Sequence, residues 1–328
     1  MNDNSQYIIL SKRQLWRKGI LFWIFVNISI FAALAQQDPQ FSQNNFNQLT
    51  TNPGFAGSSG LINVSILNRF QWVGFPGAPV TTVFNAEAAI PLIGKLDGIG
   101  LSVINDVIGF EKNVSVGLNY AWRKELDYGI LGSGISLGLM NKNLNFNMDG
   151  IDGSDLINSS DPALPQGKAG GVAADIGLGL YYQTANYDLS FSGRHLNRPV
   201  MSFGQSGKYT LQRVFYLSGS YSYQMADERL EAIPSIFYKR DAAAWQADLN
   251  ISLLYDKKMW GGIGYRFGDA LIISLGTEFW NGIKFGYSYD MNISAMSRYN
   301  SGSHEFFLSY SVLLYKKHNH KYKSVRFL

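Results

Sequence analysis

The stretch 113–123, NVSVGLNYAWR, alternates small or polar residues with the apolar residues Val114, Val116, Leu118, Tyr120 and Trp122. Because successive side chains of a β-strand point to opposite faces, such a strand has one apolar face and one polar face. Similar stretches recur from about residue 60 to residue 315, separated by Gly, Asn, Ser or charged residues. So many repeats, with so aromatic an apolar face, are typical of an outer-membrane β-barrel whose apolar side faces lipid.

The composition supports a barrel and excludes several other classes. Of the 328 residues, 46% are hydrophobic and only 16% are charged, against about a quarter charged in ordinary soluble domains. The mean hydropathy of -0.06 argues against a bundle of spanning helices and suits a barrel with a polar lumen. The absence of cysteine excludes disulfides and thiolate metal sites. The net charge of +4 is modest and dispersed, and it gives no indication of nucleic-acid binding.

The first residues have the pattern of a secretion signal. A basic stretch that includes Arg17 and Lys18 precedes an apolar run over 19–31, and Ala33-Leu34-Ala35 offers a small-x-small cleavage site. A membrane anchor is the alternative, but the run is short for a membrane span. We therefore predict a cleaved signal peptide over 1–35, export, and a mature chain that begins near Gln36.

Period-two patterning bounded by turn residues predicts about fourteen strands. They cover 61–72, 80–90, 98–106, 113–124, 129–142, 171–183, 186–194, 209–224, 230–240, 244–255, 259–267, 270–279, 282–290 and 304–315. Strands of about ten residues suit a tilted span of the hydrocarbon layer. The predicted fold is an all-β, transmembrane, antiparallel β-barrel.

The connections between these strands differ in length by parity. The longest connections, 143–170, 195–208 and 291–303, follow odd-numbered strands, whereas most connections after even-numbered strands are tight. Bacterial barrels have short periplasmic turns and longer extracellular loops. The sequence thus predicts long extracellular loops after the odd strands.

The remaining parts of the chain flank this barrel of 60–315. A barrel of about fourteen strands encloses a lumen that wall side chains alone do not fill. The segment 36–59 is rich in Asn and Gln and carries Phe41, Phe46 and Phe55. We expect it to act as a plug or as a periplasmic contact, because disordered segments are poor in aromatic residues. The closing residues 316–328 form a basic tail that we expect in the periplasm.

No catalytic constellation stands out in the sequence, and no cofactor is predicted. Ser303, His304 and Glu305 resemble triad members, but neighbours in a strand point to opposite faces and cannot cooperate directly.

The acidic loop with Asp149, Asp152 and Asp155 is a weak calcium candidate, since it lacks the spacing and the closing Glu of an EF-hand. A solvated surface loop is the default interpretation. We interpret the charged residues predicted to face inward as an internal charge network rather than a selectivity device. These residues are Glu87, Arg123, Asp175, Asp188, Arg194, Arg266 and Glu278.

Ordered motifs lie along the chain at 37–43, 52–58, 71–81, 260–266, 286–290, 302–305 and 326–328. Together they resemble the PorP/SprF family of Bacteroidetes. One departure is Gly54-Phe55, where the family usually shows Ala-Tyr. The resemblance implies an outer membrane barrel of the type IX secretion and gliding machinery. Such a barrel assists export, or holds a large adhesin-like protein at the surface through its C-terminal domain, and contacts periplasmic components. No enzymatic activity is implied.

Three functions remain open at this point. The leading interpretation is a non-enzymatic docking barrel, with an alternative as a transport channel for small or hydrophobic solutes and a third as a hydrolase. In the connection 71–79, Trp72, Phe75 and Pro76 offer rigid apolar contact area of the kind that dominates interfaces. The candidate partner-binding residues are Gln71, Trp72, Phe75, Pro76, Arg266, Asp269, Tyr287, Asp290, His304 and Glu305.

Overall fold

A computed structural model describes residues 38–90, 92–93, 97–145, 168–203, 207–279 and 282–313 of the chain. The predicted signal peptide, the basic tail and the calcium candidates Asp149, Asp152 and Asp155 lie outside the described residues.

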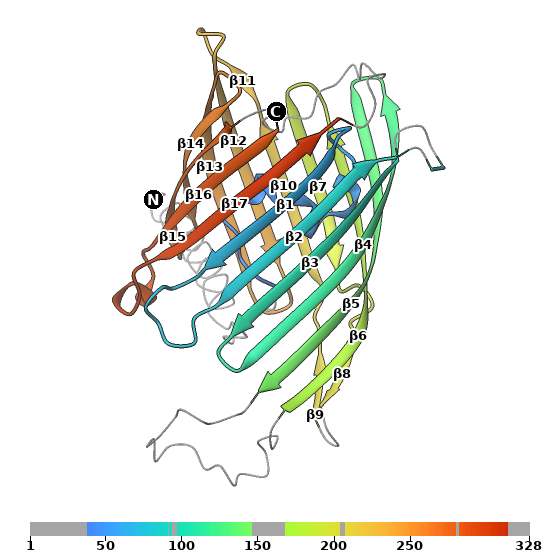
Figure 1. Cartoon of the computed structure of the whole chain (residues 1–328), viewed down its shortest axis with the longest axis vertical. Coiled ribbons are helices and arrows are strands. Elements are labelled where there is room, and N and C mark those ends of the chain that lie inside the picture. Colours follow the sequence, from blue (N-terminus) through green and yellow to red (C-terminus); the bar gives the residue numbers. More distant parts are fainter. Residues whose placement is uncertain are drawn as a thin grey trace, which may run out of the picture.

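Within this part of the chain, fourteen antiparallel strands form one closed barrel, with β10 and β11 as two parts of one strand (Figure 1). The barrel strands are β1 (Ile62–Phe70), β2 (Val80–Ala89), β3 (Gly98–Ile108), β4 (Glu111–Leu126), β5 (Gly129–Asn145), β6 (Lys168–Gln183), β7 (Tyr187–Arg194), β10 (Val214–Tyr221), β11 (Tyr223–Gln224), β12 (Leu230–Arg240), β13 (Trp245–Tyr255), β14 (Met259–Arg266), β15 (Ala270–Phe279), β16 (Ile283–Asn292) and β17 (Ser303–Val312). The predicted fold class is confirmed.

The barrel closes where the first strand meets the last. β1 pairs with β17 from Ile62 opposite Val312 to Phe70 opposite His304, and β1 pairs with β2 on its other side. Elsewhere each strand pairs with its neighbours along the chain, and β10 pairs with β7 on one side and with β12 on the other. Since every barrel strand has two neighbours, the backbone hydrogen-bonding groups are satisfied within the wall, as a lipid environment requires.

The region between β7 and β12 departs from the sequence prediction. The connection predicted at 195–208 contains a two-stranded hairpin of β8 (Val200–Phe203) and β9 (Gly207–Thr210). The single strand predicted over 209–224 is wrong, because β9 ends at Thr210 and the barrel strand begins at Val214. Four-residue strands are too short for a clear period-two signal. The ladder is also interrupted opposite Pro234, which has no N–H to donate.

The two faces of the wall differ as the alternation predicts. The outward side chains Leu118 and Ile263 are each 65% exposed, whereas the inward Asn119 and Arg123 are buried. The apolar face is therefore the outside of the barrel.

Successive strands run in opposite directions, so their connections gather at two ends. The connections that follow β1, β3, β5, β7, β12, β14 and β16 form the long-loop end. Figure 1 shows the β8–β9 hairpin projecting at the lower edge, which is this end. The other end, with turns such as 184–186 and 256–258, is the short-turn end. The helical elements are η1 (Asn44–Phe46), α2 (Gln48–Thr51) and η2 (Pro53–Phe55) ahead of β1, and η3 (Ala295–Arg298) after β16. Among the described residues, no helix combines the length and apolar character needed to cross a membrane.

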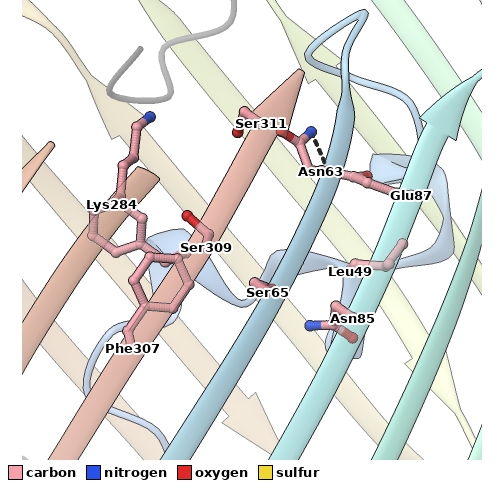
Figure 2. A pocket seen from close by; sticks show the side chains of 10 residues that line it. Leu49, Asn63, Ser65, Asn85, Glu87, Lys284, Phe307, Ser309 and Ser311 are labelled. Atoms are coloured by element: carbon pink, nitrogen blue, oxygen red, sulfur yellow. Dashed lines mark hydrogen bonds between the residues drawn. The ribbon is translucent and has the colours of Figure 1, made fainter. Parts of the chain in front are cut away.

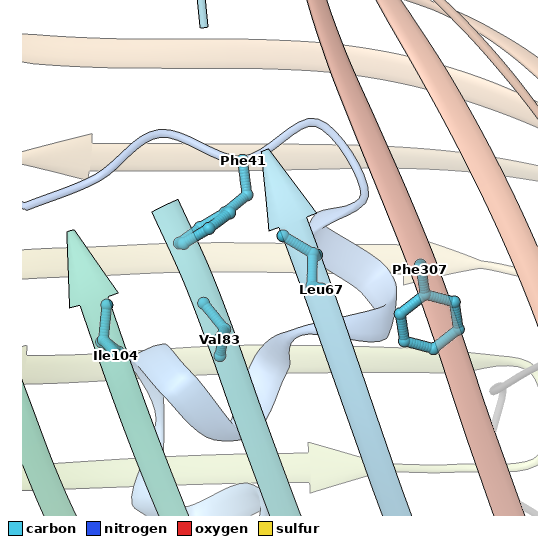
Figure 3. Close-up of a cluster of buried hydrophobic side chains, with 5 residues drawn as sticks. All are labelled: Phe41, Leu67, Val83, Ile104 and Phe307. Atoms are coloured by element: carbon cyan, nitrogen blue, oxygen red, sulfur yellow. The ribbon is translucent and has the colours of Figure 1, made fainter. Parts of the chain in front are cut away.

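Residues 38–59, here the N-terminal segment, lie inside the barrel. Phe41 of this segment belongs to one buried cluster with inward side chains of four wall strands, drawn in Figure 3: Leu67 of β1, Val83 of β2, Ile104 of β3 and Phe307 of β17. The interior is thus filled by the chain's own first described residues.

Candidate functional site

The N-terminal segment runs along the bore from one end to the other. Asp38 contacts His195, which directly follows the end of β7 at the long-loop end. At its other end the Gly57 N–H donates to Glu87, near the end of β2, and the Ser58 carbonyl accepts from Gln183, the last residue of β6. The segment therefore enters β1 from the short-turn end, while its leading residue lies near the long loops.

A cluster of polar groups, here the mouth cluster, surrounds Asp38 at the long-loop end. His195 Nε2 lies 3.0 Å from Asp38 Oδ1, and its Nδ1 lies 2.9 Å from Asp175 Oδ1. Lys239 Nζ donates to the Asp38 carbonyl at 2.9 Å, and the Tyr216 hydroxyl donates to the Asp38 carboxylate. The last member, Arg194, lies between the two carboxylates, 4.0 Å from Asp38 and 3.6 Å from Asp175.

These contacts shift the pKa values of Asp38 and His195, which both lie outside the strands. Burial lowers the pKa of His195, but the neighbouring Asp38 and Asp175 outweigh it and raise the pKa to about 9. Burial raises the pKa of Asp38, but His195 and Arg194 outweigh it and hold the pKa well below its ordinary value. At neutral pH the pair is therefore a buried imidazolium and carboxylate.

A second group of charges, here the seam cluster, lies next to the junction of β1 and β17. Arg69 pairs with Asp290 at 2.7 Å and with Glu305 at 3.1 Å. Arg266 pairs with Asp290 at 2.8 Å and with Asp248 at 3.1 Å. All five side chains are almost completely buried, and buried charges persist only when they are paired and hydrogen-bonded.

The N-terminal segment supplies the remaining hydrogen bonds of the seam cluster. The Ser42 and Gln43 N–H groups donate to Glu305 at 2.9 and 2.7 Å. The Ser42 hydroxyl donates to Asp290 at 2.6 Å, and Arg266 donates to the Phe41 carbonyl at 2.8 Å. The segment is thus part of the network that connects β1, β14, β16 and β17.

Aromatic side chains hold the middle of the segment. The Phe46 ring lies 5.0 Å from that of Trp260 and 4.9 Å from that of Phe307. Further along, Phe55 meets Tyr181 edge-on at 4.9 Å. Because apolar side chains of the segment meet apolar side chains of the wall, burial also stabilises this arrangement.

Glycines in the wall allow the backbone of the segment to approach closely. A Cβ added at Gly134 would lie 2.3 Å from the Gly54 nitrogen, and one added at Gly98 would lie 2.0 Å from the Ala56 carbonyl oxygen. Real Cβ atoms essentially never come so close to a backbone atom. Both glycines sit at inward positions of β5 and β3, where any other residue would displace the segment.

Small polar cavities remain between the segment and the wall. One is lined by Phe46 and Leu49 of the segment and by wall residues that include Asn63, Glu87 and Lys284 (Figure 2). Figure 2 shows the Asn63 amide bonded to Glu87, and the distance is 3.1 Å. No group of three or more His, Asp or Glu residues in the described part of the chain could hold a metal ion.

The structure separates the predicted partner-binding residues into three places. Arg266, Asp290 and Glu305 come together in the seam cluster, with Asp269 3.8 Å from Arg266. Tyr287 and His304 lie on the outward face, where the hydroxyl and Nδ1 are 2.7 Å apart. The remaining four candidates, Gln71, Trp72, Phe75 and Pro76, lie in the connection between β1 and β2 at the long-loop end. The roles of all ten in partner binding stay predictions.

The connection between β1 and β2 is held to the β16–β17 connection. The Trp72 N–H donates to Ser303 Oγ at 3.1 Å, and Val73 exchanges backbone hydrogen bonds with Gly302 and Ser301. Trp72 adopts a φ of 51°, which is unusual for a non-glycine residue. Phe75 is 40% exposed at the tip. The loop therefore presents an exposed aromatic side chain on a fixed backbone.

Six residues of the two clusters were not among the sequence candidates: Asp38, Arg69, His195, Tyr216, Lys239 and Asp248. The sequence signal that could have identified three of them is the alternation along the strands. It places Tyr216, Lys239 and Asp248 at inward positions, where polar side chains need a partner. The internal charge network predicted from the sequence is confirmed at Asp175, Arg194 and Arg266.

Comparisons with known proteins agree with this architecture. A family model described as "Type IX secretion system membrane protein PorP/SprF" matches residues 33–310. No curated protein matches the chain.

Three solved structures show the extent of the structural likeness. CdiB from Acinetobacter baumannii has 12% identity and a TM-score of 0.41, with 76% of this chain and 60% of that chain covered. The outer membrane protein Omp33 from the same organism has 8% identity and a TM-score of 0.44 over 78% and 99% of the two chains. A TodX deltaS2S3 mutant monoaromatic hydrocarbon channel has 12% identity and a TM-score of 0.44 over 80% and 93%.

Proposed function

The chain belongs to the PorP/SprF family of type IX secretion system membrane proteins, and from this premise we propose that it is a non-enzymatic docking barrel of the bacterial outer membrane. Its long-loop end holds a large exported adhesin-like protein through that partner's C-terminal domain. Its short-turn end faces the periplasmic components of the secretion and gliding machinery.

The observation that carries this proposal is the filled bore. The N-terminal segment makes hydrogen bonds, ion pairs and aromatic contacts with the wall along its length, and wall glycines fit its backbone. A barrel filled in this way is a rigid body, and rigid elements position binding loops with little loss of conformational entropy.

The long-loop end offers suitable contact surface. Phe75 and Val73 are exposed in a connection that hydrogen bonds fix to the neighbouring loop. Exposed aromatic side chains on a fixed backbone are frequent anchors of protein interfaces.

The filled bore argues against the alternative of a transport channel. A passage for solutes needs a continuous lumen, and here Phe46 and Phe55 occupy the middle of the barrel. The arrangement also argues against a hydrolase, because Ser303 and Glu305 point into the bore while His304 lies outside.

Affinity purification from cell envelopes in mild detergent tests the proposal. We expect recovery of a very large surface protein with a secretion-directing C-terminal domain, and no steady conductance from the purified barrel in planar bilayers. Recovery of the barrel alone, together with stable pores, would instead support a channel.

A further inference from the structure

The N-terminal segment contacts the junction of β1 and β17 at two successive inward pairs of residues. Arg69 of β1 lies opposite Glu305 of β17, and Leu67 lies opposite Phe307 at the next inward position. At the first pair, the Ser42 hydroxyl accepts from Arg69 at 3.0 Å and the Ser42 N–H donates to Glu305 at 2.9 Å. One residue of the segment is therefore hydrogen-bonded to both sides of the junction.

The second pair is joined to the segment by apolar contacts. Leu67 and Phe307 belong with Phe41 to one buried cluster (Figure 3). The Phe46 ring lies 4.9 Å from that of Phe307. Because burial of apolar surface is favourable, these contacts stabilise the arrangement in which both strands lie against the segment.

The wall by itself gives the seam cluster an excess of carboxylates. Its three carboxylates face two guanidiniums, and Asp269, 3.8 Å from Arg266, adds a fourth carboxylate at the edge. Residues 41–44 of the segment hydrogen-bond to all five members of the cluster. The segment thus adds donors at the place where the wall has more acceptors than it can pair.

Two neighbouring residues make most of these bonds. The consecutive Ser42 and Gln43 N–H groups donate to Glu305, and successive backbone N–H groups commonly form anion-binding sites. The Ser42 hydroxyl donates to Asp290 and accepts from both guanidiniums of the cluster. A hydroxyl has one donor and two acceptor sites, so all of its hydrogen-bonding capacity is used here.

We infer that the N-terminal segment is the closing template of the barrel, on which the first and last strands come together, and that it is in the bore before or when they pair. Water in an unfilled bore would hydrate the seam cluster and screen its ion pairs, and screened pairs hold two strands together only weakly. With the segment in place the same five side chains are buried. The ion pairs therefore stabilise the junction when the segment covers them. This inference does not depend on the proposed docking function.

The close fit of the segment in the bore favours this order of events. A Cβ added at Gly286 of β16 would lie 2.4 Å from the Gln43 side-chain oxygen, and one added at Gly98 of β3 would lie 2.0 Å from the Ala56 carbonyl oxygen. Drawing the segment lengthwise through a closed wall would break such contacts repeatedly. A wall that is still open between β1 and β17 can instead close around the segment.

Pairs of engineered cysteines measure the order, since the natural chain has none to give background. Ile66→Cys with Leu308→Cys reports on the junction, because these outward residues lie directly opposite each other on β1 and β17. Thr50→Cys with Asn85→Cys, whose natural side-chain oxygens lie 3.3 Å apart, reports on the segment in the bore. Each double variant is refolded separately from urea into detergent and oxidised in brief pulses.

We expect the segment disulfide to form no later than the junction disulfide. Full yield is defined by oxidation of each folded barrel, and failure of the segment pair to oxidise there would contradict a segment that lies in the bore. A junction pair that reaches full yield while the segment pair is still reduced would overturn the inference. Both measurements use otherwise natural chains.

A proline at position 43 tests the donors. Gln43→Pro removes the N–H that donates to Glu305 at 2.7 Å, whereas the control Gln43→Ala loses the same side chain and keeps the N–H. We expect Gln43→Pro to slow the junction disulfide at least about tenfold relative to Gln43→Ala, as for loss of a hydrogen bond to a charged group. It should leave a β1–β2 disulfide, from Ile66→Cys with Phe84→Cys, unchanged. Equal rates for proline and alanine, or equal slowing of both cysteine pairs, would overturn the role of these donors.

Glu305→Gln separates a lost donor from backbone strain. Gln43 has a φ of -92°, outside the usual range of proline, so the proline also strains the segment. A neutral side chain at position 305 depends less on the donor than a buried carboxylate does. The effect of the proline on the junction disulfide should therefore shrink several-fold in the Glu305→Gln background. An undiminished effect would show that strain, and not the lost donor, slows closure.

Discussion

His195 Nε2 lies 3.0 Å from the Asp38 carboxylate, although 157 residues separate the two in sequence. The bond joins the first described residue of the chain to the wall at the long-loop end. The bond holds the start of the N-terminal segment at this end of the bore, and its strength depends on the charges of both groups.

Alkaline pH should weaken this attachment. The pKa of His195 in the folded barrel is about 9, above its ordinary value of 6.5, because Asp38 and Asp175 outweigh the effect of burial. Its contribution is therefore complete below about pH 6.5 and is lost as the pH rises through about 9. This difference between the folded and the ordinary pKa of His195 corresponds to roughly 3 kcal/mol in the free energy of unfolding. Thermal unfolding in detergent should show lower stability at pH 9.5 than at pH 6, and His195→Gln should remove this dependence. An equal pH dependence in the variant would contradict the assignment.

The acid side has the opposite sign. The pKa of Asp38 is held below its ordinary 3.8 by His195 and Arg194, so its contribution is present above about pH 4 and is lost on strong acidification. Asp38→Asn should reduce stability at pH 6 and should leave less to lose below pH 4. Limited proteolysis of the segment, followed from pH 3 to pH 6, provides the measurement.

Filling the space that wall glycines leave open should displace the segment. A Cβ at Gly134 would meet the Gly54 backbone nitrogen at 2.3 Å. Gly134→Val should therefore open the bore and give measurable conductance, whereas we expect none from the natural barrel. Gly261→Val is the matched control, because Gly261 faces outward and the nearest atom to an added Cβ is 3.9 Å away. Both variants should keep the heat-modifiable mobility of a folded barrel. A Gly134→Val barrel that is folded and stays as closed as the control would show that the segment does not block the bore.

The prediction of the barrel from sequence succeeded where a local pattern decides the structure. The alternation of apolar and polar residues along β4 and β13 determines which side chains face lipid. This pattern can be recognised in one strand without knowledge of its neighbours. The β8–β9 hairpin was not predicted, because each of its strands has only four residues. Its position also depends on tertiary contacts of Met201 and Leu211, which no local pattern shows.

The site was harder to predict for a related reason. Asp38 and His195 each look unremarkable in sequence, and only the path of the segment brings them together. The sequence shows glycines at inward positions of β3 and β5, but it does not show that the backbone of the N-terminal segment approaches them closely.

Removing a guanidinium from the seam cluster should destabilise the barrel strongly. Arg266 is 1% exposed and neutralises Asp248 and Asp290, so Arg266→Met leaves two buried carboxylates with one cation fewer. Loss of one partner of a buried pair typically costs about 3–5 kcal/mol. Arg229→Ala is the control, because Arg229 is 62% exposed and solvent screens its pair with Asp227. The temperature at which the folded band disappears on semi-native gels should fall for Arg266→Met and barely change for Arg229→Ala. Equal behaviour of the two would mean that the seam cluster does not hold the junction.

The aromatic tip of the β1–β2 connection should contribute to partner binding. Phe75 is 40% exposed on a loop whose neighbour Trp72 is hydrogen-bonded to Ser303, so its side chain offers contact area with little motion to lose on binding. Phe75→Ala should weaken capture of the exported protein by about tenfold, as expected for an interface anchor worth about 1–2 kcal/mol. Phe279→Ala is the matched control, with a phenylalanine that is 48% exposed in the last position of β15, at the short-turn end. Both barrels should keep the same unfolding temperature, so that a difference in capture reports on binding alone. If the two variants lose capture equally, or if neither loses it, the β1–β2 connection is not where the exported protein is held.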